Sequence, residues 1–486
     1  MAKSDLQGKT VKGFFWSFVE NFLSQAVTFL VGIVLSRLLS PDLFGLVGMI
    51  MIFIAVSEIF VNSGFHQSLI RKQHVGPEDL STIFYTNLVI AVFFWSLLQL
   101  IGPWVADFYG HPILAQILPV FGIVVFIDSL ALVQKTDLTR RLDFKLLAKI
   151  SVVSNVVGGV VGIVAAYQGL GVWSLVMKSI FQKLTSTTLL WLQNKWRPIW
   201  VFDWTLLKEH FRFGSRLLIS GIIDTIFANL YYLVIGKYFS TAEVGYYSRA
   251  DQFQKLPSSN FSNIISRVSY PVMSAQVNDL DKLRTTFQQI LIGSMLMAVP
   301  MMFTLAVISD TFIVVLIGEK WLPCAIYLQL LSVIGAFYPV HHLNLLIPQL
   351  MNRTDVFLRV ELIKKAIVVL IVYFGIQFGI QWMLLATLVF NLVAYVIHGI
   401  WTQRFISYSL FRQSIDLAAP FIVGSIVALC IIAVRNCTPL ESPFLFLMLQ
   451  LSVASIGYFV VLRILFKNHY RSMLSLLKYS GWYKKG

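Results

Sequence analysis

Two arginines in one apolar segment are the residues best suited to binding chemistry in this sequence. Arg249 and Arg267 lie in the segment 244–274, about five helical turns apart, so both return to the same helical face. The same face carries three further polar residues, Gln252, Asn260 and Asn263. A guanidinium group donates two parallel hydrogen bonds and so favours carboxylate and phosphate groups. We expect this stripe to bind an anion in a polar cavity; the alternative is that both arginines reach water at the ends of the segment.

Two other segments carry matched polar lines, with one residue in every four. The lines are Glu20, Ser24 and Thr28 in one segment and Arg216, Ser220 and Asp224 in the other. We expect them to face each other across a cavity. In the segment 244–274, Asp251, Gln254 and Lys255 add polarity near the outer end. The alternative is local pairing of Arg216 with Asp224. Glu20 and Asp224 are the candidates to carry a coupling ion, since ionisable groups inside a membrane often do so.

A few other polar residues are weaker candidates. For Lys178, Lys183 and Glu58, helix packing or an interfacial position explains the residue at least as well as substrate contact. His341 and His342 are adjacent and point about 100° apart on a helix, so we expect a packed pair rather than a metal site. The sequence therefore predicts no metal and no other cofactor.

The composition shows what kind of protein positions these residues. Of 486 residues, 57% are hydrophobic and 13% charged, and the mean hydropathy is +0.76. A soluble protein carries about 25% charged residues, so this chain lacks the charge to cover a surface that faces water. The three cysteines form no CxxC pair, which argues against a disulfide framework or a zinc site. We expect an all-α integral membrane protein.

Segments of about 20 apolar residues, the length that spans a membrane, recur along the chain. About 14 spans are predicted by this length rule, at 13–38, 42–66, 80–104, 112–134, 146–168, 171–194, 214–238, 244–274, 286–308, 323–350, 361–379, 381–402, 417–435 and 443–465. With a cytoplasmic N-terminus, nearly all Lys and Arg between the spans fall on the cytoplasmic side, and the other side holds Lys237, Lys320 and Arg435. Both termini are thus predicted to be cytoplasmic. The net charge of +15 reflects topology rather than nucleic-acid binding.

An internal repeat is suggested by the ends of two segments. VLSRLLSPDLFGL (34–46) and VIGKYFSTAEVGY (234–246) align at an offset of 200 residues. Such a duplication predicts two pseudo-symmetric six-helix bundles, 1–200 and 201–403, followed by two additional helices and a basic tail in 404–486. Transporters commonly place the substrate between such halves.

Motifs for enzymatic chemistry are weak or absent. Gly8-Lys9-Thr10 lacks the earlier glycine of a phosphate loop, and no GxSxG or HExxH motif occurs. Asp279 and Asp281 fit the start of the next helix better than a metal site. We expect a protein that is not an enzyme.

Six strings carry a family resemblance. They are NSGFHQSLIRKQ (62–73), QKTDLTRRLDFK (134–145), RFGSRLL (212–218), GYYSRADQFQKLP (245–257), ISRVSYPVMSAQVNDLDKLRTTF (265–287) and IGEKW (317–321). With them the chain resembles the Wzx-type polysaccharide flippases of the multidrug/oligosaccharidyl-lipid/polysaccharide exporter superfamily, in particular the colanic-acid-type branch. The resemblance covers residues 1 to about 350; the last third matches in hydropathy alone.

The resemblance implies a function and a place in the cell. It implies alternating access in a bacterial cytoplasmic (inner) membrane, moving a polyprenyl-pyrophosphate-linked oligosaccharide to the outer leaflet for capsule, exopolysaccharide or O-antigen synthesis. The partners would be this substrate, membrane lipid, and a polysaccharide polymerase or other glycan-assembly proteins. The cationic cavity typical of the family would include Arg216, Arg249, Lys255 and Arg267, whereas Glu20 and Asp224 depart from a uniformly positive lining.

Three other functions remain open on sequence grounds. A drug or cation exporter of the same superfamily would favour an acidic and aromatic lining, which the arginine stripe opposes. A membrane polysaccharide polymerase or ligase needs a large outward loop, whereas the longest outward connector, 309–322, is short and apolar. A structural partner of a glycan-assembly complex is the third alternative.

Overall fold

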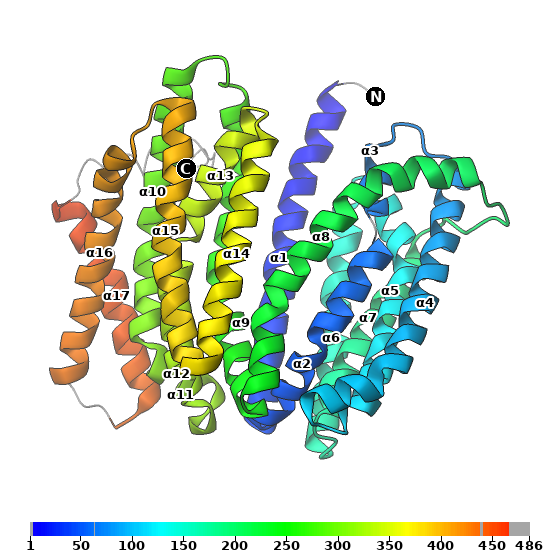
Figure 1. The fold of residues 1–486 in the computed structure, drawn as a ribbon, viewed down its shortest axis with the longest axis horizontal. Coiled ribbons are helices and arrows are strands. Elements are labelled where there is room, and N and C mark those ends of the chain that lie inside the picture. Colours follow the sequence, from blue (N-terminus) through cyan, green and yellow to red (C-terminus); the bar gives the residue numbers. More distant parts are fainter. Residues whose placement is uncertain (1–2, 63, 438–440, 466–486) are drawn as a thin grey trace. The chain divides into compact units, whose positions relative to one another are not determined.

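The structure is a computed structural model that describes residues 3–62, 64–437 and 441–465. Within these ranges it leaves undescribed the side chains of residues 3–15, 17–18, 216, 259–264, 266–268, 354, 357 and 465. The described part contains seventeen α-helices, one short 3-10 helix and no strand (Figure 1). The expected all-α fold class is thereby confirmed.

The chain divides into two compact units, Met1–Gly245 and Tyr246–Gly486. The helices of the first unit are α1 (Lys3–Leu38), α2 (Pro41–Asn62), α3 (Phe65–Arg71), α4 (Pro77–Tyr109), α5 (Leu114–Arg140), α6 (Phe144–Tyr167), α7 (Trp173–Gln193) and α8 (Trp204–Tyr238). Helix α9 (Thr241–Ser274) begins in the first unit and continues in the second. The second unit continues with α10 (Leu280–Val307), α11 (Ser309–Ile317), η1 (Glu319–Trp321), α12 (Cys324–Gly335), α13 (Tyr338–Leu350), α14 (Thr354–Phe378), α15 (Ile380–Ile406), α16 (Leu410–Cys437) and α17 (Pro443–Leu465).

Every predicted span coincides with helical structure, and one span is broken. The segment 323–350 forms two helices, α12 and α13, because Pro339 at the start of α13 has no backbone N–H to continue the helix. In the described residues, eleven helical segments are long and apolar enough to cross a membrane. The chain is therefore a multi-pass membrane protein. Helices α7, α9 and α14 are not among these eleven, so the count of 14 spans stays a prediction.

Aspartates start several of the helices. Asp143, Asp203 and Asp279 each accept a hydrogen bond from a backbone N–H in the first turn of α6, α8 and α10. Such caps satisfy donors that have no partner inside the helix. The helix-start role predicted for Asp279 is therefore confirmed. The backbone N–H groups of Thr205 and Leu206 also lower the pKa of Asp203, because they stabilise its charged form.

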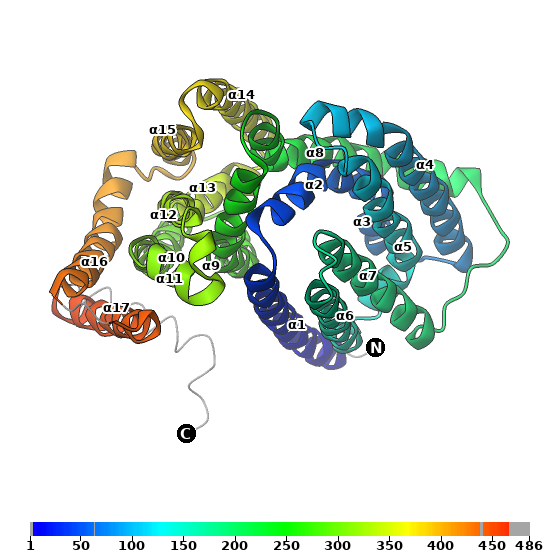
Figure 2. The same cartoon turned by 90° about the horizontal axis from the view of Figure 1, so that it is seen from below.

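In the first unit, α1, α6, α7 and α5 form a continuous series of packed helices. Helix α1 packs on α6, α6 on α7, and α7 on α5, as seen end-on in Figure 2. Gly158 and Gly162 of α6 allow α7 to come close: a Cβ on Gly158 would lie 2.6 Å from Lys178 O, and one on Gly162 would lie 2.8 Å from Lys178 Cβ. This Gly-x-x-x-Gly pair therefore forms a close-packing face between the two helices.

Two glycines 200 residues apart make the same contact with exchanged partners. A Cβ on Gly45 would lie 1.9 Å from Thr241 O, and a Cβ on Gly245 would lie 2.1 Å from Pro41 O. Pro41 and Thr241 are also 200 residues apart, and they are the first residues of α2 and α9. The two contacts thus show the same offset of 200 residues as the aligned strings, and the repeat itself stays a prediction.

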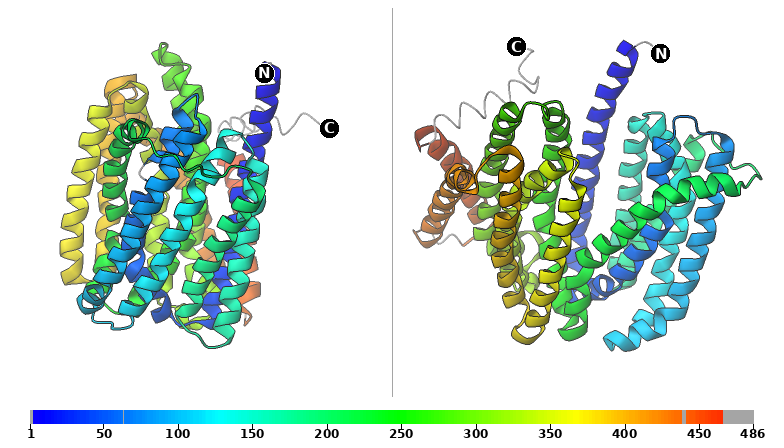
Figure 3. Two further views of the ribbon diagram at one scale, coloured as in Figure 1. Left: turned by 90° about the vertical axis from the view of Figure 1, so that its right-hand side faces the viewer. Right: turned by 45° about the horizontal axis from the view of Figure 1, so that its top comes forward.

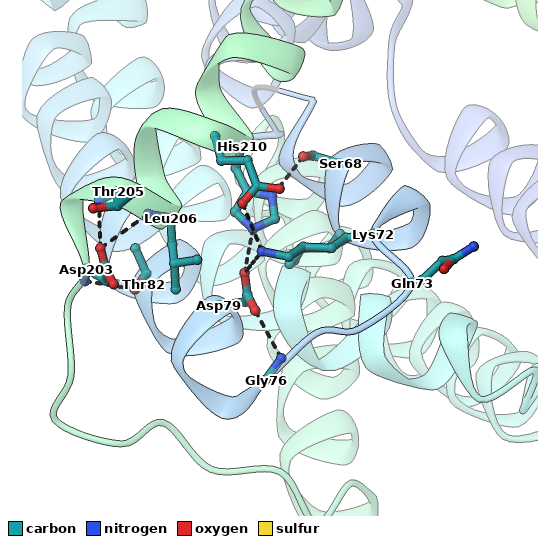
Figure 4. Close-up of polar contacts among 12 residues, drawn as sticks. Ser68, Lys72, Gln73, Gly76, Asp79, Thr82, Asp203, Thr205, Leu206 and His210 are labelled. Atoms are coloured by element: carbon teal, nitrogen blue, oxygen red, sulfur yellow. Dashed lines mark hydrogen bonds and ion pairs between the residues drawn. The ribbon is translucent and has the colours of Figure 1, made fainter.

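A buried histidine holds the start of α8 against α3 and α4 (Figure 4). His210 Nδ1 lies 2.8 Å from Ser68 Oγ, and His210 Nε2 lies 3.0 Å from Asp79 Oδ1. Lys72 Nζ donates to the same Asp79 oxygen at 2.8 Å and to Glu209 at 3.0 Å. Burial opposes the charge of Lys72, but the two carboxylates outweigh this effect and raise the pKa of Lys72.

This layer brings together three of the strings that carry the resemblance. Arg140 of α5 donates to the backbone oxygens of Lys72 at 2.7 Å and Gln73 at 3.2 Å, just after α3. His66 Nδ1 lies 2.7 Å from Thr136 Oγ1. The Arg71 guanidinium lies 4.3 Å from the centroid of the Phe213 ring at the start of the third string. The strings 62–73, 134–145 and 212–218 thus build one polar layer at the ends of their helices.

The second unit has its core among α10, α13, α15 and α16 (Figures 1 and 3). Helix α9 joins this unit through aromatic contacts: Phe253 packs edge-on against Phe312, and Tyr246 against Trp321. Pro257 and Pro271 both lie inside α9, which continues through them.

Adding one methyl group to either matched glycine should destabilise the protein. We expect Gly45→Ala and Gly245→Ala to cost about 1–3 kcal/mol each, since a Cβ there overlaps a backbone oxygen. The measurement is the thermal unfolding midpoint in detergent. Gly221→Ala is the control, because a Cβ there would make only ordinary contacts of 3.5 Å with Ile59. Equal midpoints for all three variants would contradict the tight crossing of α2 and α9.

Removing the imidazole of His210 should loosen the start of α8. His210→Ala leaves Ser68 and Asp79 buried without this partner, at an expected cost of about 1–3 kcal/mol. Hydrogen exchange of residues 203–213 should rise with the fall in unfolding midpoint. Glu209→Gln is the matched control, since Glu209 is exposed and its ion pair is worth about 1 kcal/mol or less. Unchanged exchange in His210→Ala would refute this anchoring role.

Candidate functional site

The described half of the arginine stripe lies on α9 in the second unit. Arg249 and Gln252 are half-buried, whereas Ala250 and Phe253 beside them belong to the core. Gln252 Oε1 is buried and has no hydrogen-bond partner in the described part of the chain. This side of α9 therefore offers a polar group that can receive a donor.

Lys255 is neutralised by a neighbour on its own helix. Its ammonium lies 2.7 Å from Asp251 Oδ2, and the Asp251 side chain is almost fully buried. Lys255 itself is exposed. The positive charge of Lys255, predicted to line the cavity, is thus balanced by the Asp251 carboxylate. The sequence had indicated Asp251 only as a polar residue near the outer end.

Four of the predicted site residues cannot be placed by their side chains. Asn260, Asn263 and Arg267 lie in α9 and Arg216 lies in α8, and their side chains are outside the described residues. Their roles stay predictions.

The polar line of α1 contacts α6. Ser24 Oγ lies 2.9 Å from Ser151 Oγ of α6, so this pair helps to join the two helices. Glu20 is half-buried and interacts electrostatically with Lys135 of α5. Asp224 is exposed on α8, which packs on α2, α3 and α4. Of the two expected polar lines, the line on α1 therefore contacts α6 through Ser24.

Three charged side chains meet between α2, α5 and α7. Lys183 Nζ lies 2.7 Å from Asp128 Oδ1 and 3.4 Å from Glu58 Oε1. Each of these side chains keeps about a third of its surface exposed, namely 32%, 30% and 33%. Asp128 and Lys183 lie near the middle of their helices. We call these three residues the Lys183 cluster.

The charges of the Lys183 cluster carry a cost in insertion free energy unless they face a polar interior. A charged side chain at the centre of a spanning helix costs about 2.5–3.5 kcal/mol on insertion scales. Pairing reduces this cost, and two carboxylates around one ammonium leave a formal charge of −1. In such an arrangement an incoming anion can replace a carboxylate at the ammonium, and an incoming cation or proton can bind a carboxylate.

Asp128 is the member of this cluster that sequence analysis missed. The sequence pointed to Lys183 and Glu58 separately, and an aspartate in the predicted span 112–134 was the available signal. Spacing along the chain could not show that the three residues meet, because they lie on three different helices. Among the described residues, no group of three or more His, Cys, Asp or Glu side chains could hold a metal ion.

Known proteins share the sequence and the fold of this chain. Residues 34–326 match the family model described as polysaccharide biosynthesis protein. The teichuronic acid biosynthesis protein TuaB of Bacillus subtilis is 26% identical over 57% of this chain and 58% of its own length. The succinoglycan biosynthesis transport protein ExoT of Rhizobium meliloti is 24% identical over 63% of this chain and 62% of its own length. These matches thus span about three-fifths of each relative.

The fold likeness extends over nearly the whole chain. The structure of the lipid II flippase MurJ in an inward closed conformation is similar with a TM-score of 0.76 at 14% identity, covering 94% of this chain and 99% of that one. At this identity the likeness concerns the fold alone. The family model covers more than half of the sequence and includes all six strings that carry the resemblance. The chain therefore belongs to the polysaccharide biosynthesis protein family.

Proposed function

We propose that this protein is a flippase that moves a polyprenyl-pyrophosphate-linked oligosaccharide from the inner to the outer leaflet by alternating access. The observation that carries the proposal is the Lys183 cluster, a set of paired charges in the middle of apolar helices. A pyrophosphate with attached sugars cannot cross hydrocarbon without such polar groups. The family, the biosynthesis and transport names of the relatives and the fold of a lipid flippase support the same conclusion.

The binding groups would be distributed over both units. In the first unit Lys183 would exchange a carboxylate partner for a phosphate oxygen. In the second unit Arg249 would donate to the same class of group, and the open Gln252 oxygen would accept from a sugar hydroxyl. Arg267, Asn260, Asn263, Arg216, Glu20, Ser24, Asp224 and Lys255 complete the proposed lining.

The finer features of the proposal follow from the charge distribution of the sequence. The protein would have 14 spans in the bacterial cytoplasmic membrane with both termini in the cytoplasm. The repeat would divide it near residues 200 and 403. It would act without enzymatic chemistry of its own and deliver substrate to a polysaccharide polymerase or another glycan-assembly protein. A drug or cation exporter is less well supported, because Arg249 would repel a cationic drug.

Loss of the Arg249 guanidinium should block transport. In a flippase-deficient host, Arg249→Ala should lower surface polysaccharide about ten- to hundredfold, since a charge-assisted hydrogen bond contributes about 1.5–3 kcal/mol. Full-length lipid-linked oligosaccharide should accumulate on the inner leaflet. Arg435→Ala is the control, because Arg435 forms an exposed pair with Asp310 at the end of α16. Normal surface polysaccharide from Arg249→Ala would overturn the role of this arginine.

Variants of the Lys183 cluster should distinguish its role in folding from its role in transport. Lys183→Ala leaves two uncompensated carboxylates and should destabilise the protein by about 3–5 kcal/mol. Lys183→Gln combined with Asp128→Asn should recover part of the unfolding midpoint, because it leaves one uncompensated carboxylate, Glu58, in place of two, but it should not recover transport. Wild-type transport by this double variant would show that the cluster is structural only.

A further inference from the structure

A pair of buried histidines in the second unit has no part in the proposed binding groups. His341 of α13 and His398 of α15 bring their Nδ1 atoms within 3.3 Å, and the two rings meet edge to face. The His398 side chain is 2% exposed. Sequence analysis had considered His341 with its neighbour His342, which is exposed, and had not singled out His398.

The contact fixes how protons are shared between the two rings. A neutral imidazole has one N–H, so one ring donates from Nδ1 and the other accepts. Either ring can be the donor, because the Nε2 atoms of both His341 and His398 are buried and have no hydrogen-bond partner in the described part of the chain.

Either arrangement leaves a bare base in the interior of the unit. The donor ring carries its lone pair on Nε2, and this atom is buried with no hydrogen-bond partner among the described residues in both His341 and His398. A proton added there produces an imidazolium whose Nδ1–H still donates to the other ring. The contact then becomes a charge-assisted hydrogen bond, which is stronger than the neutral one. The pair can therefore take up a proton without losing its contact.

The surrounding charges are few and mostly paired. Lys364 of α14 is the cation that acts on both rings, and it lies 2.7 Å from Glu361. Helix α12 has no charged residue, and α10 carries its charges near its start. On α16, Asp416 accepts hydrogen bonds from Tyr408 and Gln288. The other ionisable or charged residues are Tyr338 and His342 on α13, Asp355, Arg359, Lys365 and Tyr373 on α14, Tyr395 and Arg404 on α15, and Arg412 at the near end of α16.

We propose that the His341–His398 pair is a proton-binding site of the second unit, which takes up one proton at the Nε2 atom of the donor ring during each transport cycle. Proton binding itself is independent of the proposed function, whereas its coupling to transport rests on that function. The site differs from Glu20 and Asp224, the coupling candidates of the sequence. Its ligand is a proton from water, so no other reactant is needed.

Proton binding is tested by ring-nitrogen NMR of the full chain, labelled with ¹⁵N-histidine, in lipid bilayers. Between about pH 4 and about pH 9, the range in which histidines titrate, we expect the signals of the coupled pair to report uptake of one proton. His398→Gln should remove this titration, and His342→Gln should leave it unchanged. A coupled pair that stays neutral over the whole range would overturn the proposal.

Coupling is tested in inverted membrane vesicles that contain the host's own polyprenyl-pyrophosphate-linked oligosaccharides. A gradient of one pH unit shifts a one-proton equilibrium tenfold, or about 1.36 kcal/mol, so flipping by the wild type should respond by up to this factor. His398→Gln, with an unfolding midpoint like that of the wild type, should flip at a rate that no longer depends on the gradient. A retained gradient response would overturn the coupling. Absence of flipping by the wild type would instead overturn the proposed function, and the NMR titration would still decide the site.

Discussion

The cost of charge among apolar helices governs where polar residues occur in this protein. Hydrocarbon offers no partner to an ammonium or a carboxylate, so each such group must be paired or must face a polar interior. Lys183 lies between Asp128 and Glu58, Lys255 pairs with Asp251, and Lys364 pairs with Glu361. Pairing allows charges to lie in the helices, and it also sets the number of free charges that a substrate can meet.

The crossing of α2 and α9 imposes a second constraint, a steric one. Gly45 and Gly245 each lie against the first residue of the other helix, at a distance that excludes any side chain. Both glycines and both contacted residues are offset by 200, which is the offset of the predicted repeat. Neither glycine can therefore be replaced by a larger residue without moving the backbone at this crossing.

The sequence predicted the helices well because hydropathy and length determine them locally. Each of the predicted spans coincides with helical structure, and Asp279 has its predicted role at the start of α10. The break between α12 and α13 was missed, although Pro339 was a signal for it. A proline inside an apolar run can be accommodated in a helix, as in α9, so the residue alone does not decide the outcome.

The partners of the polar residues could not be predicted, because they come from helices distant in the sequence. Lys183 and Glu58 were noted one at a time, and Asp128 and His398 were missed since each is a single polar residue in an apolar span. Asp251 was seen as polarity near Lys255, but a spacing of four residues does not show whether the pair forms. Periodicity along one helix therefore predicts which face is polar but not what that face contacts.

Paired cations have a consequence for a carrier that must release its cargo. A free guanidinium or ammonium in an apolar site would hold a pyrophosphate strongly, and the carrier would remain loaded. In the Lys183 cluster a phosphate would have to displace a carboxylate that already lies 2.7 Å from the ammonium. When the phosphate left, the same carboxylate would return, so the net free energy of binding would be small. A site with one cation and two competing carboxylates is therefore better suited to moving a charged lipid than to retaining it.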